Sequence, residues 1–265
     1  MVEKLPQLNS SDMGGEKWNE TVKSYFEAAD ITNEEVNFPA IMRGLGEIQG
    51  QTILDYGCGN GRFARRIEQM GATNVIGVDL APAMIDLAKT IDSNSRVEYY
   101  ANLDNTLSFL ADNSIDKVMA NLVFMMSPTK EDMQQAFREI HRVLKEGGVF
   151  VYLVTHPAFI ERGAHDYRNE FDGQFDYFKE GKPYRFVLID SQGREIDEKF
   201  YDHHYTLATY LNTAIQSGFT IAGIEEVSYN DPAVVEKYKI PHEFQTYPQS
   251  LMVVGEKLIT PKSHA

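Results

Sequence analysis

Residues 54–61 read Leu-Asp-Tyr-Gly-Cys-Gly-Asn-Gly, a glycine-rich turn that ends a short apolar run at residues 51–57. The apolar run is typical of a buried strand, and residues 62–70 have the pattern of a helix that ends before Gly71. Glycines at 57, 59 and 61 let the backbone turn tightly and lie close against a ligand. We therefore expect a strand–turn–helix unit whose helix N-terminus offers free amide groups to a bound molecule.

Outward from this turn, predicted strands alternate with predicted helices. Further strands are expected at residues 74–80, 97–102, 115–123, 149–155, 219–227 and 250–258. Helices are expected at residues 82–90, 131–145 (ended by Gly147-Gly148) and 206–216. This alternation predicts an α/β fold, a doubly wound, Rossmann-like sheet of seven strands that is parallel and covered on both faces.

The regular order fails before and within this core. Two helices are expected first, at residues 18–29 and 38–48. Residues 158–205 mix many aromatic side chains with charges and glycines, and an insertion of about fifty residues is too long for an ordinary connection. We expect a substrate lid there, with a surface β-hairpin that has no role in binding as the alternative. The predicted division is a helical cap at 1–48, a core at 49–157, the lid at 158–205 and the rest of the core at 206–265.

The charge of the chain argues against nucleic acid and membrane partners. Lysine and arginine total 25 against 39 acidic residues, a net charge of −14, whereas proteins that bind phosphate backbones need a basic face. The nearest basic cluster, Arg62, Arg65 and Arg66, is expected to be a solvated helix face. A neutral or cationic small molecule is the expected partner.

Cysteine usage and the N-terminal composition favour a cytoplasmic location. Cys58 is the single cysteine, so no intrachain disulfide and no multi-cysteine metal site can form. The first twenty residues are polar and lack an apolar signal region, and no run of 18 apolar residues occurs. Histidine and acidic residues show no spacing typical of metal ligands, and we expect no metal.

An acidic residue, Asp79, closes the second predicted strand. In doubly wound folds an acid at this position accepts hydrogen bonds from ribose hydroxyls. A nicotinamide enzyme would use the same acid and a glycine turn, but its pattern is G-x-G-x-x-G, whereas Gly57, Gly59 and Gly61 follow G-x-G-x-G. A nucleoside-type ligand is predicted, with a nicotinamide oxidoreductase as the rival.

Four segments together resemble the motifs of class I S-adenosylmethionine (SAM)-dependent methyltransferases. They are LDYGCGNG at 54–61, VIGVDLAPAMIDLAK at 75–89, IDKVMANLVFMM at 115–126 and FREIHRVLKEGGVFVYLVTHP at 137–157. The resemblance implies an enzyme, a monomer or homodimer, that transfers the methyl group of SAM to an oxygen or nitrogen atom of a small molecule and releases S-adenosylhomocysteine. A relative with a non-methylation reaction such as cyclisation, and a non-catalytic SAM-binding module, remain alternatives.

The resemblance also implies contacts for individual residues. Those to the methionine end of SAM involve Tyr25, Asp55, Gly57, Cys58 and Gly59. Those to the ribose and adenine involve Asp79, Leu80, Met84, Asn102 and Leu103, while Asn121 and Leu122 would lie beneath the sulfonium. The family often has an acid where Asn102 stands, so the adenine contact departs from the usual pattern here.

Three histidines are candidates for a general base, because an acceptor that starts protonated gains from a base of near-neutral pKa. His156 follows the strand at 149–155, at the edge where open α/β sheets bind ligands, and His203 and His204 precede the helix at 206–216. Which of them acts, if any, is left open. Tyr201, Tyr205 and Phe159 are the expected substrate contacts, and the aromatic lid predicts an apolar or aromatic acceptor of secondary metabolism.

Overall fold

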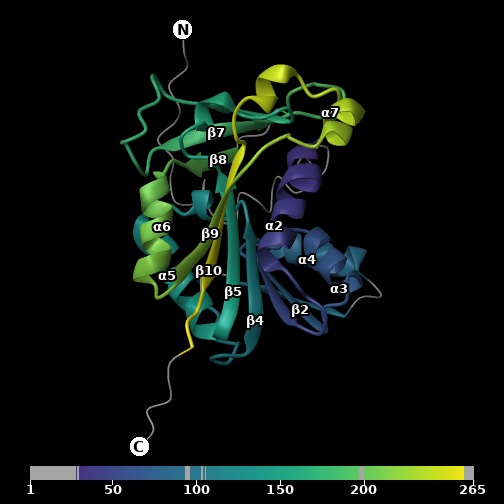
Figure 1. Cartoon of the computed structure of the whole chain (residues 1–265), viewed down its shortest axis with the longest axis vertical. Coiled ribbons are helices and arrows are strands. Elements are labelled where there is room, and N and C mark those ends of the chain that lie inside the picture. The colour runs from purple at the N-terminus through teal and green to yellow at the C-terminus, as the bar shows by residue number, and fades with distance from the viewer. Residues whose placement is uncertain are drawn as a thin grey trace, which may run out of the picture.

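A seven-stranded sheet forms the centre of the computed structural model, which describes residues 28, 30–92, 96–102, 104, 106–196 and 200–259 (Figure 1). The strand order is β3-β2-β1-β4-β5-β10-β9. The bounds are β1 Thr52–Tyr56, β2 Asn74–Asp79, β3 Val97–Ala101, β4 Ile115–Asn121, β5 Leu144–Thr155, β9 Thr220–Val227 and β10 Ser250–Glu256. The chain order reverses between β1 and β4, and the carboxyl ends of strands at such a reversal open a crevice for ligands.

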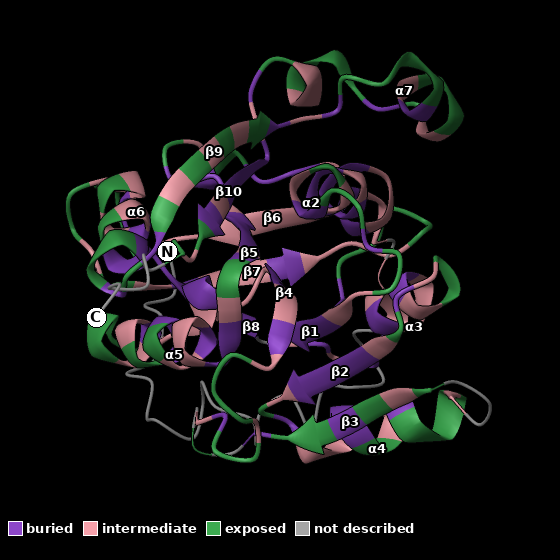
Figure 2. Cartoon of the chain, turned by 60° about the horizontal axis from the view of Figure 1, so that its bottom comes forward, coloured by how far each residue is buried: buried purple, intermediate pink, exposed green. Residues whose placement is uncertain are grey.

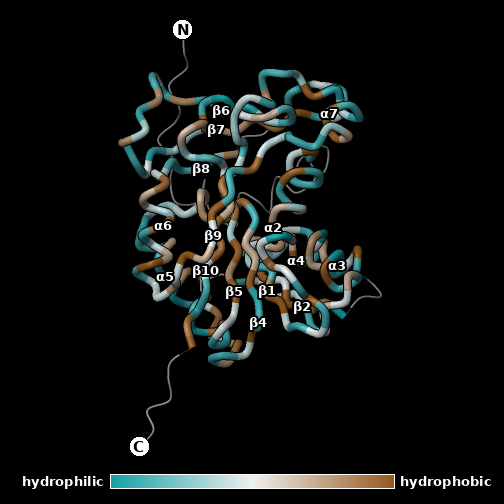
Figure 3. The backbone as a smooth tube through the Cα atoms, viewed as in Figure 1, coloured by the Kyte–Doolittle hydropathy of each residue, from teal (hydrophilic) through white to brown (hydrophobic). Residues whose placement is uncertain are grey.

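Helices cover both faces of this sheet, which confirms the predicted doubly wound α/β fold (Figures 1 and 2). One face carries α2 Phe38–Leu45, α3 Arg62–Gln69 and α4 Pro82–Ile91, and the other carries α5 Lys130–Val143 and α6 Leu207–Gln216. Alternate residues of one strand supply the two cores: Leu54 packs with the α5 side and Ile53 with the α2 side. The central strands are therefore apolar on both faces, and the apolar residues concentrate along them (Figure 3).

The expectation of a wholly parallel sheet was wrong for β10, which runs antiparallel to both β5 and β9. Ser250 at the start of β10 pairs with Val227 at the end of β9. The connection between them contains α7 Pro232–Tyr238 and η5 His242–Gln245. It stays at the end of the sheet where β9 finishes, so β10 must run in the direction opposite to β9. Helix α7 was not predicted from the sequence.

Two predicted helix boundaries were also wrong. A π-helical turn, η2 Thr32–Asn37, leads directly into α2, which ends at Leu45 rather than at residue 48. Helix α5 ends at Val143, so the pair Gly147-Gly148 does not end it. These glycines lie inside β5, where the pairing with β4 shifts register and the residues between Leu144 and Val149 bulge outward. The helix predicted at 18–29 lies outside the described residues except for Ala28.

A second, three-stranded antiparallel sheet lies over the carboxyl ends of the main strands (Figure 1). It consists of β6 Tyr167–Glu170, β7 Pro183–Leu188 and β8 Phe200–His203, with η4 Ile160–Arg162 before it. All of these elements fall within the segment predicted as a lid. Among the described residues, no helix has both the length and the apolar composition needed to cross a membrane.

Glu180, in the loop before β7, ties this second sheet to α6. One oxygen of its carboxylate accepts hydrogen bonds from Thr206 N at 2.8 Å and Thr206 Oγ1 at 2.6 Å, and the other oxygen pairs with Lys130. Burial, the largest single influence, raises the pKa of Glu180, but the donors of Lys130, Thr206 and Thr209 together lower it to about 2. The carboxylate therefore stays charged at neutral pH.

We expect Glu180→Gln to lower the free energy of unfolding at pH 7 by about 1–3 kcal/mol, because neutral hydrogen bonds replace charge-assisted ones. The folded-state pKa lies below the ordinary value of 4.5, so this stabilisation is present above pH 5 and is lost as the pH falls toward 2. Urea unfolding of wild type and variant should show a smaller difference in their free energies of unfolding at pH 3 than at pH 7. Glu236→Gln, an exposed change on α7, is the control, and a gap that is independent of pH would contradict the assignment.

Candidate active site

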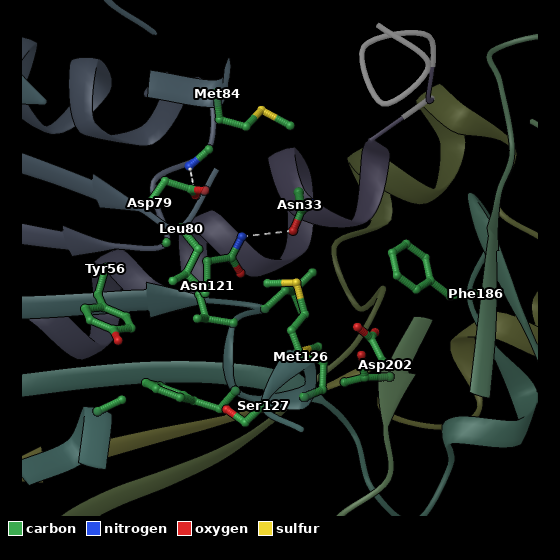
Figure 4. Close-up of a pocket in the computed structure, with 18 of the residues that line it drawn as sticks. Asn33, Tyr56, Asp79, Leu80, Met84, Asn121, Met126, Ser127, Phe186 and Asp202 are labelled. Carbon is green, nitrogen blue, oxygen red and sulfur yellow. Dashed lines mark hydrogen bonds between the residues drawn. The ribbon is translucent and has the colours of Figure 1, made fainter. Parts of the chain in front are cut away.

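A cavity of about 410 Å³ lies at the carboxyl ends of β1, β2 and β4, between the main sheet and the second sheet (Figure 4). One wall consists of the glycine turn and the start of α4. A second wall is the segment from Asn121 to Pro128, which includes the 3₁₀ turn η3 Phe124–Met126. Most of the other lining residues come from η2, from the ends of the main strands, from α5 and from β6, β7 and β8.

The glycine turn has a conformation that larger residues would not tolerate. Gly57 has φ 79°, and a Cβ there would lie 2.3 Å from Val123 Cγ2. Gly59 has φ 52°, and a Cβ there would meet no atom within 4 Å, so the space beside it belongs to the cavity. Glycine is thus required at Gly57 by packing and favoured at Gly59 by its left-handed backbone, and both line the cavity.

Asp79 holds this turn against the end of β2. Its Oδ2 accepts a hydrogen bond from Gly59 N at 2.8 Å, and its Oδ1 accepts one from Ala81 N at 2.9 Å. Burial raises the pKa of Asp79, and the two amide bonds oppose that shift. The carboxylate lines the cavity beside Leu80 and Met84, so three of the five residues expected to contact the ribose and adenine lie together (Figure 4).

Asp55 and Cys58 lie behind the turn and do not line the cavity. Asp55 is 3 % exposed, and burial together with the nearby charge of Asp79 raises its pKa to about 8. Cys58 is buried, its thiol points to Gly59 O at 3.6 Å, and burial raises its pKa. Direct contacts from these two side chains to a ligand therefore have no geometric support.

The wall beneath the expected sulfonium contains an unpaired acceptor and a strained residue. Asn121 Nδ2 donates to Asn33 Oδ1 at 3.0 Å, while Asn121 Oδ1 is buried without a hydrogen-bond partner among the described residues (Figure 4). Leu122 has φ 56°, a left-handed conformation that costs a non-glycine residue about 1–2 kcal/mol. Both line the cavity, as Asn102 also does.

These residues fit SAM. The ligand carries hydroxyl and ammonium donors and a positive sulfur, and this side of the cavity presents the Asp79 carboxylate. Asn121 lines the same side, with its Oδ1 atom buried in the wall. Leu80 and Met84 give an apolar surface for the base. Within the described ranges, no group of three or more His, Cys, Asp or Glu is placed to hold a metal ion.

None of the three candidate histidines lines the cavity. His156 Nε2 lies 3.1 Å from Glu226 Oε1, and its Nδ1 accepts from Ala158 N. His204 Nε2 lies 2.8 Å from Tyr177 O. His203 bonds to the backbone of Met125, and burial lowers the pKa of all three rings. The predicted histidine base therefore has no geometric support.

The expected substrate contacts also lie behind the cavity walls. Tyr205 donates to Ser127 O at 2.8 Å and thus supports a lining residue from outside. Phe159 packs against the His156 ring with 5.0 Å between centroids, and Tyr201 is not among the lining residues. Tyr25 and Leu103 lie outside the described residues.

The sequence did not reveal the lining residues that the second sheet and the residue directly before β6 supply. They are Asp166, Tyr167, Asn169, Phe186, Leu188 and Asp202. Asp202 precedes His203 on β8, and neighbouring residues of a strand point to opposite faces. Only recognition of β8 as a strand would have shown that Asp202, rather than its neighbour, faces the cavity.

Comparisons with known proteins agree with this geometry. Residues 54–152 match a family model described as a methyltransferase domain. The N-demethylindolmycin N-methyltransferase of Streptomyces griseus is 29% identical over 200 residues, which cover 73% of this chain and 82% of that protein. An uncharacterised protein of Haemophilus influenzae is 26% identical, with 73% and 77% covered.

Solved structures show the same fold. A SAM-dependent methyltransferase from Mesorhizobium loti is 27% identical with a TM-score of 0.63, and the match covers 82% of this chain and 95% of that one. A putative SAM-dependent methyltransferase from Listeria monocytogenes is 22% identical with a TM-score of 0.65, and 90% and 99% are covered. The second likeness concerns the fold alone.

We expect Asp79→Asn to weaken the binding of S-adenosylhomocysteine about tenfold or more. The amide loses the charge and retains one acceptor oxygen for two backbone donors, and a hydrogen bond to a charged group contributes about 1.5–3 kcal/mol. Isothermal titration calorimetry measures the effect. Asp86→Asn, an exposed change on α4, should bind as wild type does, and an Asp79 variant of undiminished affinity would refute the contact.

We expect Asp55→Asn to gain stability relative to wild type as the pH rises from about 4 to about 8. With a folded-state pKa of about 8 against an ordinary 3.8, the native protein keeps a proton that the unfolded chain releases in this window. The stability of the wild type is therefore reduced as the pH rises, and the neutral amide removes this loss. Urea unfolding of both proteins at pH 5 and pH 8 checks the sign, and a difference that stays flat or falls would show the carboxyl to be ionised in the fold.

Proposed function

The chain belongs to the class I superfamily of SAM-dependent methyltransferases, and we propose that it methylates an oxygen or nitrogen atom of a small molecule bound beneath the second sheet. The supporting observation is that one cavity is lined both by the glycine-turn residues and by residues of β6, β7 and β8. Asp202 and Phe186 lie on the opposite side of the cavity from Asp79, Leu80 and Met84 (Figure 4). On this basis residues 158–205 act as a substrate lid.

The residues of the chain need to hold, orient and dehydrate the reactants. SAM supplies an activated methyl group on a positive sulfur. The glycine turn and Asp79 hold the nucleoside end, while the 3₁₀ turn η3 and the lid strands position an acceptor and exclude water. Correct positioning can contribute about 7–11 kcal/mol to the lowering of a barrier in favourable cases.

The similarity to the Streptomyces griseus enzyme supports a small-molecule acceptor, because that enzyme is named for the N-methylation of N-demethylindolmycin. The net charge of −14 supports an acceptor other than nucleic acid. We further propose, as the sequence predicted, that the enzyme is a monomer or homodimer and acts in the cytoplasm. Its acceptor is proposed to be apolar or aromatic.

Incubation of the enzyme with SAM tritiated in the methyl group and separate panels of phenols, amines and carboxylic acids tests the proposal. We expect label in at least one panel, with one equivalent of S-adenosylhomocysteine for each methyl group transferred. Bulk RNA and denatured protein serve as the comparison substrates. Label in those macromolecules and in none of the small molecules would overturn the proposal.

A further inference from the structure

We propose that the methyl acceptor is an organic amine, and that the Asp202 carboxylate binds its ammonium form and accepts the proton that it must lose. This inference rests on the proposed function and narrows it to one substrate class. Asp202 is on β8 of the lid, across the cavity from Asp79 and Leu80 (Figure 4), and the residue is buried, with 6% of its surface exposed.

The cavity is acidic. Five of its lining residues are aspartates, namely Asp30, Asp79, Asp132, Asp166 and Asp202. Across the described part of the chain, no lysine, arginine or histidine lines it. A carboxylate or phosphate on the acceptor would meet like charge in a partly dehydrated space, whereas a cation would be attracted.

Three of these carboxylates are engaged by donors that the fold supplies. Asp79 accepts two backbone amides, as described above. Asp30 forms an ion pair with Arg62 and accepts from Asn33 Nδ2 at 2.6 Å. Asp132 lies in the first turn of α5, where it accepts from Thr129 Oγ1 at 2.7 Å.

The two remaining aspartates, Asp166 and Asp202, differ in the number and length of the hydrogen bonds that their carboxylates accept. Asp166 accepts from Thr32 N at 2.7 Å and from Thr32 Oγ1, with Tyr229 Oη also at 3.5 Å. The described residues offer Asp202 a single hydrogen bond, from Tyr184 Oη at the long distance of 3.4 Å. Of the carboxylates in this cavity, Asp202 therefore has the weakest donor, and a positively charged partner would stabilise its buried negative charge most.

The surroundings of Asp202 suit an amine on an apolar body. Phe186 lies beside it, and Met126 lies between it and the nucleoside side of the cavity, with Ser127 on the adjoining wall (Figure 4). Leu188 and Tyr167 add apolar surface to the lid side. An aromatic face also attracts an ammonium group, and the attraction persists after methylation because the product remains a cation.

A proton acceptor is needed because an ammonium group has no lone pair. The sulfonium of SAM is itself a cation, so a second positive charge beside it is repelled and favours loss of the proton. Burial raises the pKa of Asp202 to about 7, although the Tyr184 hydrogen bond opposes this shift, and Tyr167 and Tyr210 are the other titratable groups near it. A carboxylate of that basicity can accept a proton at neutral pH.

The resulting step balances in atoms and charge. The ammonium nitrogen gives one proton to the Asp202 carboxylate, which becomes a neutral carboxylic acid. The nitrogen lone pair then bonds to the methyl carbon while the carbon–sulfur bond breaks and leaves its electron pair on sulfur. The positive charge moves from sulfur to the methylated nitrogen, and Asp202 later releases its proton to solvent.

The test measures binding as well as activity. Wild-type protein saturated with S-adenosylhomocysteine is titrated calorimetrically with primary and secondary arylalkyl amines from benzylamine to tryptamine, each matched with the alcohol and the carboxylate of equal length. We expect amines to bind about tenfold or more tightly than their matched alcohols, and the carboxylates to bind most weakly. Equal binding of amines and alcohols, or binding of no amine at all, would overturn the inference.

Asp202→Asn is the matched variant, because it keeps the shape of the side chain and removes its charge and basicity. It should lose the preference for amines while binding S-adenosylhomocysteine as the wild type does. Asp172→Asn, an exposed change in the lid, removes the same charge outside the cavity and should keep the preference. An Asp202 variant that keeps the preference would overturn the inference, and if this variant fails to fold, the selectivity of the wild type decides alone.

Failure of this inference is distinguishable from failure of the proposed function. Transfer of tritium to phenols or carboxylic acids and to no amine would refute the amine acceptor and leave small-molecule methylation standing. Transfer to macromolecules alone would refute both.

Discussion

The hydrogen bonds between the Asp79 carboxylate and the amides of Gly59 and Ala81 join the glycine turn to the start of α4, which together form one wall of the cavity. One of these amides belongs to the turn after β1 and the other precedes α4, so a single side chain fixes the ends of two neighbouring strands relative to each other. The backbone bond from Gly57 N to Val78 O, 2.8 Å long, reinforces the same junction. The position of the cavity at the point where the strand order reverses depends on this connection, because a turn that swung away would open the crevice to solvent.

The fold was predictable where local sequence decides the structure. Strands buried on both faces, such as β1 and β2, are apolar runs bounded by glycine or polar residues, and the amphipathic helices between them have one clear apolar stripe. Features set by distant pairing were not predictable. The direction of β10 depends on its partner strand β9, and the bulge at Gly147 depends on the register of β5 against β4. The local pattern predicts the strands themselves, but it shows neither the direction nor the register in which they pair.

The site divides in the same way. Gly57, Gly59, Asp79, Leu80, Met84, Asn102, Asn121 and Leu122, which line the nucleoside side, all belong to segments next to strand ends of the main sheet. Their placement follows from the strand order alone. The opposite side is formed by short strands that pack onto the core only in the folded chain, and a shift of one residue in β8 exchanges Asp202 for His203 as the residue that faces inward. Asp55 shows the converse, since its motif was recognised although its side chain points into the interior.

Burial also reverses the usual ranking of side chains as bases. Exposed histidine has a pKa near neutrality and exposed aspartate is far too acidic, which is why the sequence favoured histidine. Removal from water disfavours the charged form of each group, so it lowers the pKa of His156, His203 and His204 and raises that of Asp202 to about 7. These opposite shifts make the buried Asp202 carboxylate the more basic group, and it also carries the negative charge that the proposed cationic acceptor requires. The three-dimensional surroundings, rather than the residue type, decide which side chain suits the chemistry.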